Sequence, residues 1–514
     1  MTATLTPPPA ADSAAHLAVA AGRVPRATYR LQLHKGFPFR DAAAIAPYLA
    51  ELGVSDAYTS PILRARAGSM HGYDVVDHGQ INPELGGDAG LDEFAAALKA
   101  AGLGLILDTV PNHMGVYDPA NGWWMDVLEN GAGSTVANHF DIDWHPVKPE
   151  LAGKVLLPIL EDQYGDVLEK GKFRLVYEEG AFYVFAGTVK LPVAPGSYDP
   201  ILARARDRLT EQVSETDPHV LELLSILTQI HNLPSRAETD LLRRAERNRE
   251  KEVVKRRVAA LHHACPEFRT ALDATVAEYN GTPGDPASFD LMHDLIDAQA
   301  YRPAYWRVAG EEINYRRFFD INDLAAIRVE LPEVFRAAHE VAFRLLAEGK
   351  ATGLRIDHPD GLRDPVRYFH QLQEEFVARQ AAAVRTEPEA PARDGHSPSL
   401  ALRAQDHVRL TDWFTAASVE REHALPPWPL YVVAEKILAE GEPLPPDWAV
   451  AGTVGYDFLS DVNGLFVARR SRRVFDRIYG QFTGRELDYR HLVNATKRVV
   501  MQVSMAGEIN SLAH

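Results

Sequence analysis

The feature that most constrains the fold is Leu103–Leu107, an apolar run that comes directly after a helical segment and a glycine. A strand that is apolar at consecutive positions is buried on both faces, which is typical of parallel sheets covered by helices. Two earlier segments, Ala27–Leu33 and Val54–Tyr58, carry the β-branched and aromatic residues of strands, and the residues between them have helical spacing. This alternation of strands and helices with short links predicts an α/β fold built from βαβ units.

Local signals place the ends of the helices. Asp41 is predicted to cap a helix that Gly53 ends, and a second helix is predicted over Asp92–Ala101, with Gly102 as its stop. The same units recur in the second half of the chain. There we predict helices over Leu331–Gly349 and Pro365–Val384, and strands over Gly353–Ile356 and Leu430–Ala434.

Two long excursions interrupt the alternation in this chain of 514 residues. The first, over residues 118–325, begins with β-like runs and continues with a charged helical stretch, Glu238–Ala260, whose charges we interpret as a solvated helix face. The second, over residues 385–429, has the proline-rich composition of a linker. We therefore expect a flexible tail over residues 1–24, an α/β unit over 25–117 that continues over 326–514, and inserted subdomains, mixed β and then helical, over 118–325.

The charge balance and the single cysteine exclude some classes of protein. The chain has 54 basic and 71 acidic residues, a net charge of −17, which argues against a nucleic-acid partner. Cys265 is its one cysteine, so no internal disulfide can form and a reducing compartment fits. The first residues lack a basic stretch followed by a long apolar run, so we predict no signal peptide, no membrane span and a cytoplasmic protein.

The densest group of reactive side chains lies in Gly353–Leu362, a predicted strand followed by a turn. Side chains alternate along a strand, so Arg355 and Asp357 share one face and the guanidinium can hold the carboxylate ionised. An ionised, oriented carboxylate at the carboxyl end of a strand suits a nucleophile that attacks an anomeric carbon. Taken alone, the pair fits a structural ion pair that only fixes the fold equally well.

Polar residues also follow the second and third predicted strands. After the third, His113 can donate a hydrogen bond to a ligand hydroxyl group, and Asp108 suits a residue that orients an arginine or a histidine. After the second, Tyr73 offers an apolar ring face for stacking on a sugar, and Asp74 either pairs with Arg355 or orients a neighbour. The alternatives are a capped turn with a core histidine and a surface turn with a packed tyrosine.

Glu435 directly follows the predicted strand Leu430–Ala434. A partly desolvated carboxyl group at this place has a raised pKa and can deliver a proton, provided that the Lys436 ammonium points elsewhere. The alternative is an ordinary glutamate at a strand end. Together, Asp357 and Glu435 would form the paired nucleophile and acid of a retaining glycosidase at the carboxyl ends of successive strands.

Short stretches of the chain resemble the signature regions of the α-amylase superfamily of glycoside hydrolases, in their usual order. They are Gly72–Asp74, Asp108–His113, Gly353–Asp357 and Val432–Glu435. Further strings resemble one family within this superfamily, the maltooligosyl trehalose synthases. These strings are Thr28–Gln32, Asn314–Phe319, Arg355–Leu362, Ala434–Leu438 and Gly452–Phe458.

The resemblance implies a (β/α)8 TIM barrel with domains inserted between its strands. It implies an isomerase that rearranges the reducing-end α-1,4 bond of a maltooligosaccharide or a glycogen-type α-glucan into an α,α-1,1 bond, without a cofactor or a metal. Asp357 resembles the nucleophile and Glu435 the general acid/base. The implied partner in the pathway is a maltooligosyltrehalose trehalohydrolase. The substrate-binding candidates are Tyr73, Asp74, His113, Arg355 and His358.

The chain departs from the superfamily pattern after Glu435. The superfamily uses a third carboxylate after a later strand, and no matching signature lies between Glu435 and His514, although Asp457 and Asp461 are available. About six of the eight barrel strands can be recognised, so we predict a barrel that is incomplete toward the C-terminus, with two unpaired sheet edges. Two alternatives therefore stay open: an amylase-like α-glucan hydrolase with the same carboxylates, and an inactive carbohydrate-binding fragment.

Overall fold

The computed structural model describes residues 23–238, 240–384, 428–485 and 488–513. The chain divides into two compact units. The first unit takes the residues up to His113 together with Arg328–Gly484, and the second takes Met114–Ile327 together with Arg485–His514. The predicted tail over residues 1–24 and the predicted linker over 385–429 lie almost wholly outside the described residues.

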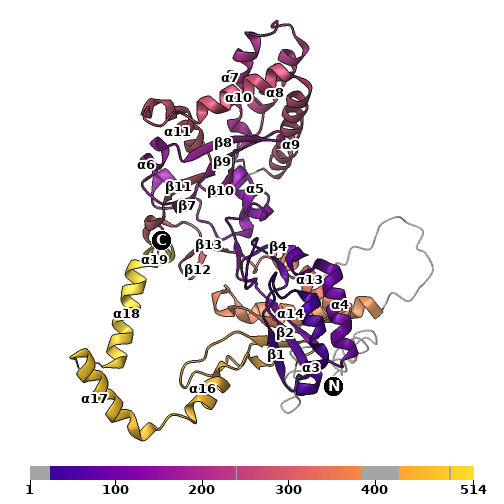
Figure 1. Ribbon diagram of the computed structural model, residues 1–514, viewed down its shortest axis with the longest axis vertical. Coiled ribbons are helices and arrows are strands. Elements are labelled where there is room, and N and C mark those ends of the chain that lie inside the picture. Colours follow the sequence, from indigo (N-terminus) through magenta and orange to yellow (C-terminus); the bar gives the residue numbers. More distant parts are fainter. Residues whose placement is uncertain (1–22, 239, 385–427, 486–487, 514) are drawn as a thin grey trace, which may run out of the picture. The chain divides into compact units, whose positions relative to one another are not determined.

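The first unit is built on a parallel sheet (Figure 1). Each neighbouring pair of its strands is parallel, and the order confirms the predicted α/β fold with an incomplete barrel. The first and last strands of this order are its edges in the described part of the chain. Among the described residues the sheet has six strands, in the order β1 (Thr28–Leu31), β2 (Asp56–Thr59), β5 (Gly104–Thr109), β14 (Gly353–Ile356), β15 (Tyr431–Ala434) and β16 (Gly452–Thr453).

Helices pack against this sheet because its central strands are buried throughout. All positions of β5 and β14 are buried. The helices α4 (Gly87–Ala100), α13 (Pro332–Ala347) and α14 (Pro365–Val384) contribute apolar side chains to the same core. Burial of one large apolar side chain stabilises the fold by about 1.5–3 kcal/mol, so this core holds the strand ends in place. Its members include Phe94, Leu98, Leu105, Leu107, Phe335, Leu345, Leu354, Phe369 and Leu372.

Most helix bounds of the first unit lie close to the predicted ones, and one predicted cap is wrong. Gly53, with φ 88°, ends α3 (Ala46–Leu52) as predicted. Asp41 does not cap a helix, because it lies inside the first turn of α2 (Phe39–Ala44). The predicted single helix is also divided between α2 and α3, since Pro47 at the start of α3 lacks the N–H group that a continuous helix would use.

The second unit contains a small antiparallel sheet and, later in the chain, a group of helices (Figure 1). In none of the described residues does a helix combine the length and the apolar character that crossing a membrane requires. The sheet consists of β8 (Phe173–Glu178), β9 (Ala181–Ala186) and β10 (Val189–Pro192). The helices that follow are α7 (Asp199–Thr210), α8 (Pro218–His231), α9 (Leu241–Ala264) and α10 (Pro266–Tyr279). Other strands are β7 (Val155–Leu160), which pairs with β11 (Tyr301–Tyr305), and the hairpin of β12 (Arg317–Phe318) and β13 (Ile321–Ala326).

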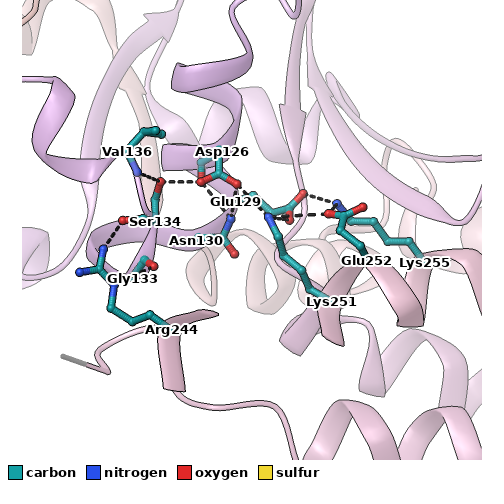
Figure 2. Close-up of polar contacts among 10 residues, drawn as sticks. All are labelled: Asp126, Glu129, Asn130, Gly133, Ser134, Val136, Arg244, Lys251, Glu252 and Lys255. Carbon is teal, nitrogen blue, oxygen red and sulfur yellow. Dashed lines mark hydrogen bonds and ion pairs between the residues drawn. The ribbon is translucent and has the colours of Figure 1, made fainter. Parts of the chain in front are cut away.

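A buried cluster of charges joins α9 to α5 (Gly122–Asn130), as Figure 2 shows. The Lys251 ammonium lies 2.8 Å from Asp126 and 2.9 Å from Glu129, and the Lys255 ammonium lies 2.7 Å from Glu129. Lys251 is 5% exposed. The prediction that the charges of α9 form a solvated face is therefore wrong for these lysines, because the carboxylates of α5 compensate them inside the protein.

The last helices of the chain group with the second unit, although residues 326–514 were expected to continue the barrel. They are α18 (Tyr489–Val503) and α19 (Ala506–Ala513). The Arg317 guanidinium, in a residue that is 6% exposed, lies 2.6 Å from Glu508 of α19. This buried ion pair links α19 to the second unit, so the segment Arg485–His514 groups with that unit.

Candidate active site

The predicted nucleophile and acid follow adjacent strands at the same level. β14 and β15 pair in register at Ile356 and Ala434, so Asp357 and Glu435 are the next residues on these parallel strands. The Glu435 N–H group donates to the Ile356 carbonyl at 2.9 Å and extends the register to the strand end. Because side chains alternate in direction along a strand, both carboxyl groups leave the sheet on the same face.

Arg355 holds Asp357 through an ion pair. Its Nη1 atom lies 2.6 Å from Asp357 Oδ1 and 2.8 Å from Asp108 Oδ1. All of these residues are buried, and Asp357 is 8% exposed. Within the described ranges the Nε–H group of Arg355 has no hydrogen-bond partner, so the guanidinium keeps one donor unused. The contact that strand alternation predicts between Arg355 and Asp357 is thus present.

Asp108 lies within β5 rather than after it, and its Oδ1 atom accepts a hydrogen bond from Arg355, so it suits the orienting role that we predicted. Burial raises the pKa of Asp108 to about 6, and the Arg355 charge acts against this rise. The Asp108 Oδ2 atom accepts hydrogen bonds from the hydroxyl groups of Tyr73, at 2.6 Å, and Tyr58, at 3.0 Å. A buried carboxylate with these donors holds the guanidinium in one orientation.

Tyr73 belongs to this network, whereas Asp74 has other partners. The Arg355 guanidinium lies over the Tyr73 ring, with 5.8 Å between Cζ and the ring centre. Burial raises the pKa of the Tyr73 hydroxyl group, so this group stays protonated and can donate. Asp74 accepts a hydrogen bond from Ser69 Oγ and lies 3.9 Å from His71 Nδ1. Of the two roles considered for Asp74, these contacts favour the orientation of a neighbour.

The two candidate histidines are held by tight local packing. His113, which is 1% exposed, begins β6 (His113–Gly115), and its Nδ1 atom is 3.4 Å from the Asn112 amide nitrogen. His358, two residues after the end of β14, has a left-handed backbone with φ 47°. Such a backbone costs about 1–3 kcal/mol and is typical of functional sites. A Cβ atom at Gly361 would lie 2.4 Å from the His358 ring and 2.7 Å from Asn112 Oδ1, so glycine alone leaves room there.

Glu435 is half-buried, and the cation next to it in sequence is engaged elsewhere. The Lys436 ammonium lies 3.0 Å from Asp360 and 3.0 Å from Glu442. A proton-delivering Glu435 requires this arrangement, because a nearby ammonium group would favour the ionised carboxylate.

The later carboxylates form no further centre in the part of the chain that the structure describes. Asp457 and Asp461 lie on α16 (Tyr456–Gly464) and are exposed. Asp457 accepts a hydrogen bond from the Thr453 hydroxyl group at 2.8 Å, which links the first turn of α16 to the end of β16. In the same described residues, no group of three or more histidine, cysteine, aspartate or glutamate side chains could hold a metal ion.

Arg30 and Tyr58 also face the network, and neither is among the predicted site residues. β1 and β2 pair in register at these two residues. Arg30 Nη2 donates to the Tyr73 hydroxyl group at 3.1 Å, and the Arg30 guanidinium lies 5.4 Å from the centre of the Tyr58 ring. The sequence signal that could have found them is one polar side chain in each of two neighbouring strands. That these two side chains share a face of the sheet follows only from the register of the strands.

The parallel sheet and the side chains at its carboxyl edge agree with a known family. The family profile described as "Alpha amylase, catalytic domain" matches residues 45–192, a range that includes β2, β5, Tyr73 and His113. Residues 45–192 are thus similar to the catalytic domain of the α-amylase superfamily.

Within the superfamily the chain is similar to maltooligosyl trehalose synthases. It is 31% identical over 447 residues to a Mycobacterium tuberculosis protein named as a maltooligosyl trehalose synthase, and this match covers 86% of the chain and 38% of that protein. The structure of maltooligosyltrehalose synthase from Arthrobacter ramosus matches at 28% identity and a TM-score of 0.62, over 95% of this chain and 44% of that one. A structure from Sulfolobus tokodaii, described as a hypothetical maltooligosyl trehalose synthase, matches at 25% identity and a TM-score of 0.58, over 96% and 46%. The chain spans less than half the length of these relatives.

Proposed function

We propose that this chain carries catalytic groups of an intramolecular transglycosylase, which converts the reducing-end α-1,4 bond of a maltooligosaccharide into an α,α-1,1 bond. The observation that carries the proposal is the placement of Asp357 and Glu435 directly after a registered pair on adjacent parallel strands. Adjacent strands lie about 4.8 Å apart, and a retaining glycosidase needs its two carboxyl groups about 5–5.5 Å apart. The relatives named as maltooligosyl trehalose synthases favour this reaction over others that the same carboxylates could perform.

In the first step Asp357 acts as the nucleophile. Its carboxylate attacks the anomeric carbon of the second glucose from the reducing end, and a covalent bond forms as the α-1,4 bond breaks. Glu435 gives its proton to the departing oxygen, which becomes the 4-hydroxyl group of the released glucose. The Arg355 guanidinium holds the attacking carboxylate in place throughout.

In the second step the released glucose is the acceptor. It turns in its subsite until its own anomeric hydroxyl group faces the covalent intermediate. Glu435 now acts as a base and removes the proton of this hydroxyl group as its oxygen attacks, and Asp357 leaves as a carboxylate. Two inversions retain the α configuration. No cofactor takes part, because the intermediate stores the energy of the broken bond.

Three of the remaining candidates bind the reacting glucose. Tyr73 presents a ring face that suits an apolar sugar face, and His113 and His358 donate hydrogen bonds to sugar hydroxyl groups. Isomerisation differs from hydrolysis in the exclusion of water. The captured glucose has a high effective concentration beside the intermediate, and it reacts before water does if water is kept out.

The test follows reducing ends and chain length together, with maltopentaose as the substrate. Isomerisation removes the reducing end without shortening the chain, whereas an amylase-like hydrolase creates new reducing ends. We expect loss of reducing ends with the parent chain and with Asp92→Asn, an exposed control, and no reaction with Asp357→Asn. Retained turnover in Asp357→Asn would remove Asp357 as the nucleophile. Binding of maltopentaose without turnover would identify a carbohydrate-binding fragment.

The proposal includes a compartment and a neighbour in the pathway. The single cysteine, Cys265, is free and buried, which fits a reducing compartment, and we place the reaction in the cytoplasm. The product has no reducing end. We propose that a maltooligosyltrehalose trehalohydrolase consumes it by cleaving the α-1,4 bond beside the trehalose unit.

A further inference from the structure

We propose that Tyr58 is a positioning residue for this reaction, which sets the charge state of Asp108 and, through Arg355, the strength of the nucleophile Asp357. The inference rests on the proposed function. Tyr58 acts through Asp108 rather than on the substrate, so its effect appears in how the reaction depends on pH.

Two tyrosines share one oxygen of Asp108. The Oδ2 atom accepts from Tyr73 at 2.6 Å and from Tyr58 at 3.0 Å, while the Oδ1 atom accepts from Arg355 at 2.8 Å. Asp108 is 4% exposed, so these protein donors replace the water that would surround an exposed carboxylate. Loss of either hydroxyl group leaves a buried carboxylate with one donor fewer, and the ionised form becomes less favourable.

The consequence reaches Asp357 because one nitrogen serves both carboxylates. Arg355 Nη1 lies 2.8 Å from Asp108 and 2.6 Å from Asp357. While Asp108 is ionised, the guanidinium is shared between two carboxylates. It therefore neutralises less of the negative charge of Asp357, and this charge stays available for attack. When Asp108 takes up a proton, the guanidinium pairs with the Asp357 carboxylate alone. Asp357 is then held more tightly by the cation and is a weaker nucleophile.

Tyr58 is itself braced by an arginine on the neighbouring strand. The Arg30 guanidinium lies 5.4 Å from the centre of the Tyr58 ring, and Arg30 Nη2 donates to the Tyr73 hydroxyl group at 3.1 Å. Arg30 Nη1 donates in turn to Gln32 at 2.6 Å. The arginine therefore fixes both tyrosines that donate to Asp108. The titratable and charged groups that act on Asp108 are Tyr58, Tyr73, Arg355 and Asp357, with Arg30 beyond the tyrosines.

The variant Tyr58→Phe removes the hydroxyl group and keeps the ring. Asp108 then takes up a proton at a higher pH than in the parent chain, where its pKa is about 6. We expect the acid limb of maltopentaose turnover to move up by about one pH unit, and turnover at pH 6 to fall about fivefold. Turnover at pH 8 should fall less than about twofold, because Asp108 is ionised there in both chains. A merely structural hydroxyl group would lower turnover by the same factor at every pH, and that result would overturn the proposal.

A matched control removes a hydroxyl group from the neighbouring strand. Tyr29 lies in β1 next to Arg30, and 41% of it is exposed. Since strand alternation points it to the opposite face from Arg30, Tyr29→Phe should leave the pH profile in place. The same shift in Tyr29→Phe and Tyr58→Phe would mean that Asp108 does not transmit the effect, which also overturns the proposal.

Thermal unfolding gives a second readout that does not need turnover. The pKa of Asp108 is raised from 3.8 to about 6 in the folded chain, so folded Asp108 binds a proton that the unfolded chain releases between these values. Its contribution to stability is present at low pH and is lost as the pH rises through about 6. Tyr58→Phe raises the folded pKa further, so its loss of Tm should be larger at pH 8 than at pH 5, by about 1–2 °C.

The pH profile of turnover and the pH dependence of Tm together distinguish a failure of this proposal from a failure of the proposed function. In an Asp108→Asn background, Tyr58→Phe should show equal losses of Tm at pH 5 and pH 8, since no carboxylate is left to titrate. A pH-dependent loss that persists in that background, or equal losses in the parent background, would overturn the role of Tyr58. If the parent chain does not turn over maltopentaose and the pH-dependent loss of Tm is still present, the proposed function fails and the action of Tyr58 on Asp108 is supported.

Discussion

Asp108 and Asp357 share one nitrogen atom, the Nη1 of Arg355, at 2.8 and 2.6 Å. Two carboxylates from adjacent strands that converge on one buried guanidinium repel each other unless the cation stays between them. Arg355 is therefore needed both for the fold and for the chemistry. This arrangement also differs from the isolated ion pair that the sequence alone leaves open, because a simple structural pair would hold one carboxylate.

Arg355→Met is expected to destabilise the first unit strongly. The variant leaves Asp108 and Asp357 buried without their cation, which costs about 3–5 kcal/mol of the free energy of unfolding. Arg355→Lys keeps the positive charge but loses the planar guanidinium group, so we expect an intermediate loss of the free energy of unfolding. Urea unfolding followed by circular dichroism measures both. Arg40→Met, whose side chain is 82% exposed, is the control and should change stability by less than about 0.5 kcal/mol. A loss below about 1 kcal/mol in Arg355→Met would contradict the paired, buried arrangement.

Gly361→Ala is expected to weaken maltooligosaccharide binding. The new Cβ atom would lie 2.4 Å from His358 Cδ2 and 2.7 Å from Asn112 Oδ1, so the histidine ring must move. Loss of its hydrogen bond to the sugar costs about 1 kcal/mol, or roughly fivefold in Kd. Calorimetric titration with maltopentaose measures this change. Gly165→Ala adds a Cβ atom that meets nothing within 4 Å, and its Kd should equal that of the parent. An unchanged Kd in Gly361→Ala would show that His358 does not contact the substrate.

The sheet of the first unit could be predicted because its strands and helices are encoded locally. β14 and α14 have the predicted bounds, since an apolar strand pattern and a proline at a helix start are visible within a few residues. The place of Arg485–His514 could not be predicted, because it depends on contacts between distant segments. The ion pair of Arg317 with Glu508 joins residues far apart in the sequence, and no local sequence pattern predicts it.

The site could be predicted to the same extent and for the same reason. Arg355 and Asp357 lie on one strand, so alternation alone predicts their contact. Tyr58 reaches Asp108, and Arg30 reaches the two tyrosines, only through the register of β1 on β2 and of β2 on β5, which a local pattern does not contain. Packing across the sheet sets the register. The sequence alone therefore does not predict that these two residues belong to the site.

Lys251→Met is expected to destabilise the second unit. The substitution leaves the carboxylates of Asp126 and Glu129 without the buried ammonium that lies 2.8 and 2.9 Å from them, at a cost of about 3–5 kcal/mol. Amide hydrogen exchange along α9 measures the loss, because α9 is held to α5 by this cluster. Lys170→Met, at an ion pair with Asp162 whose side chains are 52% and 47% exposed, is the control and should change stability by less than about 1 kcal/mol. Undiminished protection of α9 in Lys251→Met would show that apolar contacts hold the helix without the cluster.

Buried histidines are expected to make the first unit sensitive to acid. His339 is fully buried, and its Nδ1–H group donates to the Phe335 carbonyl at 2.7 Å while its Nε2 atom accepts from the Tyr368 hydroxyl group at 2.7 Å. These partners fit a neutral ring, which has one donor and one acceptor. Burial lowers the pKa of His339 from 6.5 to about 4, so the unfolded chain protonates the ring where the folded chain does not. The stability that follows is complete above pH 6.5 and is lost as the pH falls toward 4.

His339→Gln keeps polar groups at this place and removes the titration. The variant should be less stable than the parent at pH 7. Between pH 7 and pH 4.5 the free energy of unfolding should fall less in the variant than in the parent, and the difference between the two falls is up to about 3 kcal/mol. Urea midpoints at several pH values measure the slope, and His71→Gln, an exposed histidine of the same unit, should keep the slope of the parent. If His339→Gln also keeps that slope, the acid sensitivity belongs to another group. His78 is then the first to examine, because it is fully buried and burial lowers its pKa to about 4 as well.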